Sequence, residues 1–329
     1  MLATKTPAEL AAAADAAAHI LADGQPVALP TETVYGLAAD ALRPEAVVKI
    51  FEAKERPFFD PLIVHLPTRE WLERVATIPP GNRALIEALI AQYWPGPLTL
   101  VLPRTGMIPD IVTSGLETVA VRMSAHAVFR AVINRVGKPL AAPSANRFGR
   151  ISPTDAAHVR SELAGRIPLI VDGGTTEHGL ESTILKIEGG GMQVLRAGPV
   201  TIEELARFGE ARYVAAGARP DAPGQLQSHY APRTPLHLIA AGSLRSHLNT
   251  RAERAGFLAW QQRPEGLKWQ PCEVLSPSGD LREAAATLFA RMRRLDEAGL
   301  DVIYAESVPE HGLGIAIMDR LRKAAAEHV

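Results

Sequence analysis

Two cations on either side of Glu55 are the first residues in this sequence whose spacing suggests chemistry. Lys54 and Arg56 are separated by one residue, and Pro57 follows them directly. Because proline ends a helix, the ammonium and the guanidinium can converge on one polyanion beyond the helix end. A basic helix C-terminus that only complements the helix dipole is the alternative. The spacing is compatible with a phosphate-binding pair but does not decide between the two.

Arg122 lies in the segment 118–124, which reads TVAVRMS. Side chains alternate along a strand, so Thr118 and Ala120 share one face with Arg122, and three apolar residues take the other face. The apolar face is suited to packing, whereas the opposite face leads past small residues to a guanidinium. We interpret that face as a carboxylate-binding pocket. An arginine on an exposed sheet face would give the same pattern.

Three more polar residues lie in or next to expected strands. His65 is inside an apolar run, where a histidine is usually a core residue that has found a hydrogen-bond partner. Ser144 and Asn146 follow an expected strand at 139–142, and a turn there would expose both side chains. Taken alone, this pair equally suits a local Asx-type turn. The role of all three depends on what lies beside them in space.

Apolar runs and helical patterns alternate along the first two thirds of the chain. Strands are expected at 26–30, 61–66, 98–102, 118–123, 139–142, 167–171, 182–187 and 192–196. Helices are expected at 8–20, 44–54, 81–92, 126–136, 153–163 and 201–208. Capping boxes are expected at the start of the helix 8–20, from Thr6 and Glu9, and of the helix 201–208, from Thr201 and Glu204. The helix 153–163 is expected to have Ser152 as its cap and Pro153 as its first residue. Gly189–Gly191 is typical of a hairpin turn. The pattern predicts an α/β domain with a mixed sheet.

Residues 209–234 are rich in proline and glycine and have little periodicity, which indicates a linker or a long ordered loop. After it, strands are expected at 236–240, 256–260, 272–275 and 300–305, and helices at 242–253, 280–298 and 312–326. We therefore expect a catalytic domain over 1–208, a linker or lid over 209–234, and a smaller Rossmann-like α/β domain over 235–329. Gly312 and Gly314 lack the third glycine of a dinucleotide fingerprint, so a plain helix start is favoured.

Composition narrows the class of protein. The 329 residues suggest two domains at about 150 residues each. The net charge is 35 minus 36, or −1, which argues against broad electrostatic binding to nucleic acid or to an acidic membrane. Cys272 is the single cysteine, so no intrachain disulfide or multi-thiolate metal site can form, and a reducing, cytoplasmic location is expected. No targeting signal and no apolar run of about 18 residues is present.

The familiar catalytic signatures are missing, because the sequence has no Walker loop, no HExxH and no GxSxG. It does contain an ordered set of polar segments: TETVYG at 31–36, Lys54-x-Arg56, Ser144-x-Asn146 and LRAG at 195–198. This set resembles the YrdC-like catalytic domain of threonylcarbamoyl-AMP synthases over about residues 7–208. The segment from Pro223-Gly224 to His229-Tyr230-Ala231-Pro232, with a further α/β domain, resembles the long two-domain form of that family.

The resemblance implies a YrdC-like open twisted mixed sheet and a nucleotidyltransferase reaction. L-Threonine, bicarbonate and ATP would give L-threonylcarbamoyl-AMP and pyrophosphate, with Mg²⁺ arriving on ATP and no organic cofactor. Downstream threonylcarbamoyl-transferase proteins would place the group on the adenosine beside the anticodon of tRNA, which allows a weak contact with tRNA itself. No membrane partner is implied. The substrate carbamate would be the nucleophile, so the protein would position groups and neutralise phosphate charge.

Site residues follow from the same motif match. Threonine would be held by Thr33, His65, Arg122, the backbone of Ala142, and Ser182. ATP would be held by Lys54, Arg56, Asp60, Thr118, Ser144, Asn146, Ser152 and Arg196, with Tyr230 reaching in from the linker; Lys54 and Arg56 would also be the catalytic cations. Asp60 is a departure, since many relatives have asparagine or histidine there. An acid beside a triphosphate is unfavourable unless it faces the metal or a sugar hydroxyl.

Two other classes of function are compatible with such a domain. One is a double-stranded RNA or ribosome-binding factor, because related domains carry a concave basic surface; the net charge of −1 argues against it. The other is a carbamoyltransferase that uses the same fold with another acceptor. Dependence on threonine separates both from the first interpretation.

Overall fold

The computed structural model describes residues 1–214, 222–224, 230–243, 254–263 and 271–326. It divides into two compact units. The first unit comprises residues 1–148, 153–177 and 181–226, and the second comprises residues 149–152, 178–180 and 227–329. None of the helices in these ranges is long and apolar enough to cross a membrane.

A mixed sheet forms the centre of the first unit. In the described part of the chain its eleven strands lie in the order β1-β8-β2-β3-β7-β4-β6-β5-β9-β10-β11. The strands are β1 (Leu2–Ala3), β2 (Val27–Leu29), β3 (Gly36–Asp40), β4 (Ile63–His65), β5 (Leu98–Pro103), β6 (Thr118–Arg122), β7 (Leu140–Ala141), β8 (Leu169–Asp172), β9 (Thr183–Glu188), β10 (Gly191–Arg196) and β11 (Ala211–Tyr213). Parallel and antiparallel neighbours are both present: β4 runs parallel to β6, and β7 runs antiparallel to β4.

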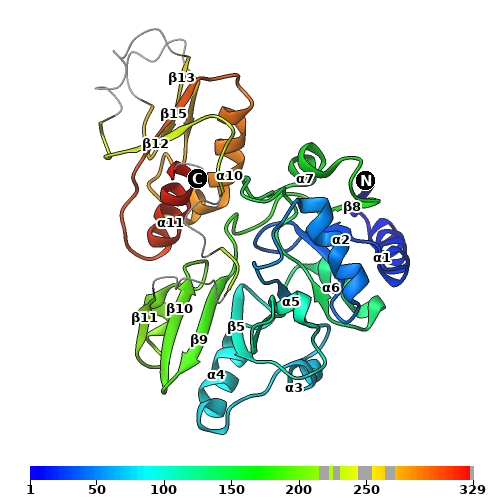
Figure 1. The fold of residues 1–329 in the computed structure, drawn as a ribbon. Helices are drawn as coiled ribbons and strands as arrows, with labels where there is room; N and C mark the ends of the chain where they lie inside the picture. Colours follow the sequence, from blue (N-terminus) through cyan, green and yellow to red (C-terminus); the bar gives the residue numbers. More distant parts are fainter. Residues whose placement is uncertain (215–221, 225–229, 244–253, 264–270, 327–329) are drawn as a thin grey trace. The chain divides into compact units, whose positions relative to one another are not determined.

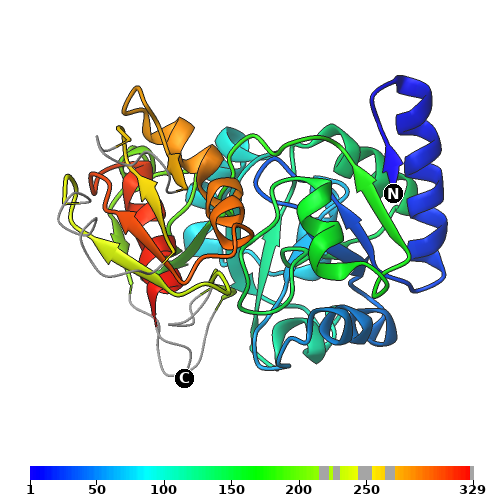
Figure 2. The same cartoon turned by 90° about the horizontal axis from the view of Figure 1, so that it is seen from above.

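Helices cover the sheet of this unit on two sides (Figure 1). They are α1 (Pro7–Ala22), α2 (Pro44–Lys54), α3 (Leu72–Val75), α4 (Arg83–Tyr93), α5 (Asp110–Thr113), α6 (Ala127–Val136), α7 (Ala156–Leu163) and α8 (Ile202–Leu205), with 3₁₀ turns at Arg69–Trp71 and Pro80–Asn82. One face of α1 consists of small residues such as Ala14 and Ala17. This face packs with Phe129 and Val132 of α6 against β2 and β8. Figure 2 shows α1 running beside the N-terminal strand β1.

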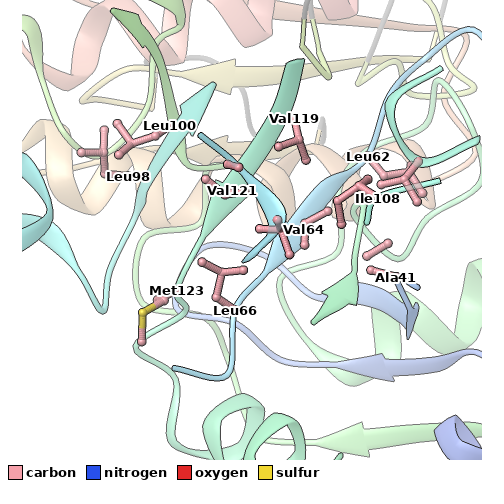
Figure 3. Packing of buried hydrophobic residues seen from close by; sticks show 14 of the residues in the cluster. Ala41, Leu62, Val64, Leu66, Leu98, Leu100, Ile108, Val119, Val121 and Met123 are labelled. Carbon is pink, nitrogen blue, oxygen red and sulfur yellow. The ribbon is translucent and has the colours of Figure 1, made fainter. Parts of the chain in front are cut away.

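The larger core lies on the other side of the sheet. There Val119, Val121 and Met123 pack with apolar residues of β4 and β5 (Figure 3). Ala120, from the opposite face of β6, belongs to a separate small cluster. The alternation predicted for residues 118–123 is therefore confirmed, and it leaves the Arg122 face of the strand free of the main apolar core.

The second unit contains a four-stranded parallel sheet in the order β12-β15-β13-β14, counted over its described residues. The strands are β12 (Leu236–Ile239), β13 (Ala255–Ala259), β14 (Cys272–Val274) and β15 (Val302–Glu306), and the helices are α10 (Leu281–Asp296) and α11 (Leu313–Ala325). The predicted small α/β domain is confirmed. The helix expected at 242–253 lies largely outside the described residues, as does His229.

Several local predictions are confirmed and others need correction. Thr6 and Glu9 form the capping box of α1, and Gly189 and Gly190 take positive φ in the β9–β10 hairpin, as predicted. The helix expected from Pro153 begins instead at Ala156. Its cap is Asp155, whose carboxylate accepts from His158 N at 2.8 Å. An aspartate can satisfy a helix start directly, so it takes precedence over the Ser-Pro signal upstream.

Three strands were not predicted, and the shortest of them is the two-residue β1 at the N-terminus. β3 follows directly after the polar TETVY segment, whose turn-like composition hides it. β11 lies inside the segment expected to be a linker, and it pairs with β10 in parallel. Its three residues are too few to give a periodic signal. The ordered sheet therefore continues beyond residue 208, where the first domain was expected to end.

Candidate functional site

Neighbouring strands bring His65 and Arg122 together. They end β4 and β6 respectively, and their Cα atoms are direct partners in the parallel pairing of these strands. Arg122 is buried, with its Nη1 donating to Thr33 Oγ1 at 3.1 Å and its Nη2 donating to Glu32 Oε1 at 2.5 Å. The predicted association of Thr33, His65 and Arg122 is thus present in the structure. An exposed position for Arg122 is ruled out.

Glu32 is the residue of this group that sequence reasoning missed. Its Oε2 accepts from Ser124 Oγ at 2.5 Å and from Ala125 N at 3.1 Å, while Oε1 takes the Arg122 guanidinium. Burial would raise the pKa of Glu32, but Arg122 and the Ser124 hydroxyl outweigh it and lower that pKa to about 2. A carboxylate within a largely apolar stretch was the available signal, because such a group is buried only with a partner.

Two polar atoms beside this ion pair have no hydrogen-bond partner within the described ranges. They are Arg122 Nε and His65 Nδ1. Burial, with the Arg122 charge adding to it, lowers the pKa of His65 to about 3, so the ring is neutral at physiological pH. A buried polar atom without a partner is costly unless a ligand or water satisfies it. The pair therefore marks a place where a small polar ligand can be held.

Lys54 is not the exposed cation of a helix end. It is the last residue of α2, is 1% exposed, and its Nζ donates to the carbonyl oxygens of Ser144 and Asn146 at 2.5 Å each. Burial, with the nearby Arg56 charge, lowers the pKa of Lys54 well below that of a free lysine. Through Lys54 the end of α2 is tied to the Ser144–Asn146 turn, which brings three predicted residues together.

Arg56 and Asp60 form a buried ion pair four residues apart. Arg56 Nη2 lies 2.8 Å from Asp60 Oδ2, and the guanidinium also donates to the carbonyls of Asp60 and Pro61. Burial raises the pKa of Asp60, against the lowering effect of Arg56, Lys54 and Arg196. Arg56 is the basic residue shown in direct contact with this carboxylate, and Lys54 and Arg196 are buried basic side chains of the same unit. Basic groups of this kind suit the binding of phosphate oxygens.

Arg196 ends β10 and is held by the neighbouring chain. Its Nε donates to Ser182 O at 3.0 Å and its Nη2 to Ser182 Oγ at 3.1 Å, while Nη1 donates to Pro223 O at 3.3 Å. Ser182 Oγ also shares a hydrogen bond of 2.8 Å with Thr99. The structure therefore joins Ser182, predicted for one substrate, directly to Arg196, predicted for the other.

The structure gives fewer contacts for Thr118 and Ala142, two of the other residues predicted for the site. Thr118 is half-buried at the start of β6. The N–H of Ala142 donates to Ile63 O at 2.9 Å, so a backbone contact with a ligand would have to use the Ala142 carbonyl. In the described part of the chain, no three His, Cys, Asp or Glu residues gather in a way that could hold a metal ion.

Ser152 and Tyr230 belong to the second unit. Tyr230 has φ 63° and is buried, with its ring stacked on Phe289 at 5.6 Å between centroids and the Arg320 guanidinium 5.2 Å from the ring centre. Its expected place over a nucleotide, and the part of Ser152 in ATP binding, stay predictions.

Comparison with known proteins gives the class first. Residues 19–198 match the Sua5/YciO/YrdC family, described as "Telomere recombination", and residues 200–326 match a family described as "Threonylcarbamoyl-AMP synthase, C-terminal domain". This is the two-part organisation of the long YrdC-like proteins.

Relatives that are similar over nearly all of this chain identify the family more specifically. Threonylcarbamoyl-AMP synthases of Pyrococcus abyssi and Bacillus subtilis are each 41% identical to the chain, over 95% of it and over 94% and 93% of their own lengths. The structure of P. abyssi Sua5 complexed with L-threonine superposes with a TM-score of 0.88 at 37% identity, over 98% of this chain and 96% of that one. The chain belongs to the threonylcarbamoyl-AMP synthase family.

Proposed function

We propose that this protein converts L-threonine, bicarbonate and ATP into L-threonylcarbamoyl-AMP and pyrophosphate. The observation that carries the proposal is the presence of two buried polar groups in the first unit of a chain that belongs to this family. One is Arg122 with His65, which suits an amino-acid carboxylate. The other is the buried Arg56–Asp60 ion pair, together with the buried basic side chains of Lys54 and Arg196, which suits a polyphosphate.

Threonine binding is assigned to the Arg122 side. The substrate carboxylate pairs with the guanidinium through Nε, and the neutral His65 Nδ1 is available to a second polar group of the amino acid. Thr33 and Ser182, with the carbonyl of Ala142, complete this part of the site. Loss of a proton from the substrate amine allows its nitrogen to bond to carbon dioxide, which yields a carbamate.

ATP binding is assigned to the cation group. The carbamate oxygen attacks the α-phosphorus, the bond to the bridging oxygen breaks, and pyrophosphate leaves with the electron pair. Lys54, Arg56 and Arg196 stabilise the charge that develops on the departing group, with Thr118, Ser144 and Asn146 placing the nucleotide. No protein nucleophile is required, in agreement with the absence of a nucleophilic motif in the sequence.

Mg²⁺ is proposed to arrive on ATP, held mainly by phosphates and water. Asp60 suits a place beside that ion or a ribose hydroxyl, because its Oδ1 has no hydrogen-bond partner among the described residues. No organic cofactor enters the reaction. A cytoplasmic location and transfer of the threonylcarbamoyl group to tRNA by separate proteins belong to the same proposal.

Identifying the product tests this proposal. Purified protein is incubated with ATP, Mg²⁺, bicarbonate and isotopically labelled L-threonine, and the quenched mixture is separated and analysed by mass spectrometry. A species containing threonine, one carbonyl and AMP is expected, and it should vanish when bicarbonate is removed. Threonyl-AMP, the mixed anhydride without the extra carbonyl, or no adduct at all in folded protein, would overturn the assignment.

A further inference from the structure

Glu32 connects two segments that are about 90 residues apart in sequence, around the proposed threonine site. It lies between β2 and β3, it takes the Arg122 guanidinium from the end of β6, and it takes Ser124 and Ala125 from the chain that leads into α6. Ser124 Oγ in turn accepts from His126 N at 3.3 Å. A single carboxylate between β2 and β3 thus holds both the Arg122 guanidinium and the chain just beyond β6.

Glu32 is buried, and both of its carboxylate oxygens are engaged by other residues of the protein. Its two oxygens already accept three hydrogen bonds, and the side chain is 5% exposed. Arg122, in contrast, uses Nη2 for Glu32 and Nη1 for Thr33, and its Nε has no partner in the described structure. The contacts of Glu32 and Thr33 therefore leave the Nε edge of the guanidinium for a ligand.

We infer that Glu32 is a positioning residue that sets the affinity for the amino-acid substrate by holding Arg122 with its Nε edge toward the substrate carboxylate. This inference rests on the proposed function. A guanidinium with a long side chain loses considerable conformational freedom when it is fixed, and a prearranged partner removes that cost from the binding step. Because Glu32 acts through Arg122, replacing it should change the affinity for threonine and leave the affinity for ATP unchanged.

The test is to measure L-threonine and ATP binding separately, by calorimetry, in wild type, Glu32→Gln and Glu32→Asp. Glu32→Gln keeps the size of the side chain but loses the charge. We expect its Kd for threonine to rise about tenfold or more, since a charge-assisted hydrogen bond is commonly worth that factor. The Kd for ATP should stay within about twofold. Glu32→Asp keeps the charge and should recover part of the threonine affinity.

Glu306→Gln is the matched control. Glu306 is a buried carboxylate of the second unit that accepts two backbone N–H groups, from Gly242 at 2.9 Å and Trp260 at 2.8 Å. This variant measures the general cost of neutralising a buried acid and should leave threonine affinity unchanged. If Glu32→Gln does not fold, Ser124→Ala replaces it. That variant removes one donor to Glu32 while keeping the ion pair, and it should weaken threonine binding about threefold.

The outcomes separate the inference from the function on which it rests. Absence of threonine binding in wild type would count against the proposed function. Binding in wild type with an unchanged Kd in Glu32→Gln, or in Ser124→Ala where that variant stands in, would overturn the positioning role alone. An equal loss of threonine and ATP affinity would also overturn it, because general damage to the fold does not distinguish the two ligands.

Discussion

Arg122 is the residue on which threonine recognition depends in this account. Its guanidinium donates hydrogen bonds to both Glu32 and Thr33, and its Nε has no partner among the described residues and can donate to a ligand. Lysine in its place would keep the charge, but its ammonium cannot match the fork geometry of these partners. Arg122→Lys should therefore raise the KM for threonine about tenfold or more, with the KM for ATP nearly unchanged. Steady-state kinetics with each substrate varied in turn provides the measurement. A rise in the KM for ATP alone would show that Arg122 belongs to the nucleotide-binding site.

Lys54 and Arg56 should matter through turnover. Removing one cation that stabilises a departing phosphate commonly costs about 10²-fold to 10³-fold. Arg56→Ala should show a loss of that order. Lys54→Arg should lose less because the charge remains, although the larger group cannot reproduce both short contacts to Ser144 and Asn146. Pyrophosphate release at saturating substrate, in variants with wild-type melting temperatures, measures the effect; a wild-type rate in Arg56→Ala would contradict the role.

As the pH is lowered, the first unit should lose stability through its buried histidines, at a higher pH than that at which carboxylates become protonated. The folded-state pKa of His65 is about 3 and that of His126 is also lowered by burial, whereas an unfolded histidine takes up a proton near its ordinary value of 6.5. The unfolded chain thus binds more protons as pH falls below about 6.5, so stability decreases there. Glu32 adds to the loss only below its ordinary pKa of 4.5.

The melting temperature should therefore fall between about pH 7 and pH 5, and His65→Asn should flatten that dependence. An identical slope in the variant would show that His65 does not stay neutral in the folded protein.

At the scale of elements, the segment just after β10 lies very close to the segment that leads into β9, and Arg196 is the last residue of β10. A Cβ added to Gly198 would lie 2.5 Å from Thr183 N and 2.6 Å from Glu181 O, on either side of Ser182. Because both contacts are backbone, Gly198→Ala must push these two segments apart. We expect a loss of about 1–3 kcal/mol in unfolding free energy, together with a higher KM for ATP. Gly106→Ala, where a Cβ meets open space, is the control. Equal denaturation midpoints for the two variants would contradict this account.

Elements with a strong local signal were predictable from the sequence. The capping box of α1, the glycine hairpin and the alternation in β6 depend on neighbours within a few residues. β3 and β11 were missed because pairing partners, and not their own composition, make them strands. α7 was placed three residues early because Ser152-Pro153 and Asp155 give competing start signals.

The sequence names candidate site residues but not their partners. Arg122 and Lys54 were candidates, and their partners Glu32 and Ser144 lie 90 residues away in sequence. Such pairs depend on the tertiary fold, so periodicity and motif spacing cannot supply them. Lys54 illustrates the consequence, because the sequence shows a basic residue at the end of a helix and does not show that this residue is buried.

For the molecule as a whole, the central claim is that threonine is an obligatory substrate of the adenylating reaction. A net charge of −1 and the burial of the candidate cations argue for small-molecule chemistry and against a nucleic-acid-binding surface. The account explains the absence of a protein nucleophile only if the substrate itself attacks ATP. A carbamoyltransferase with another acceptor would lack this dependence.

Pyrophosphate release from ATP, measured with and without L-threonine in the presence of bicarbonate, tests this claim most directly. The account predicts release that requires both threonine and bicarbonate and that falls strongly in Arg122→Lys at low threonine concentration. Omission of either substrate should reduce release to the background of protein-free solution. Release from ATP that is unchanged by threonine would contradict it.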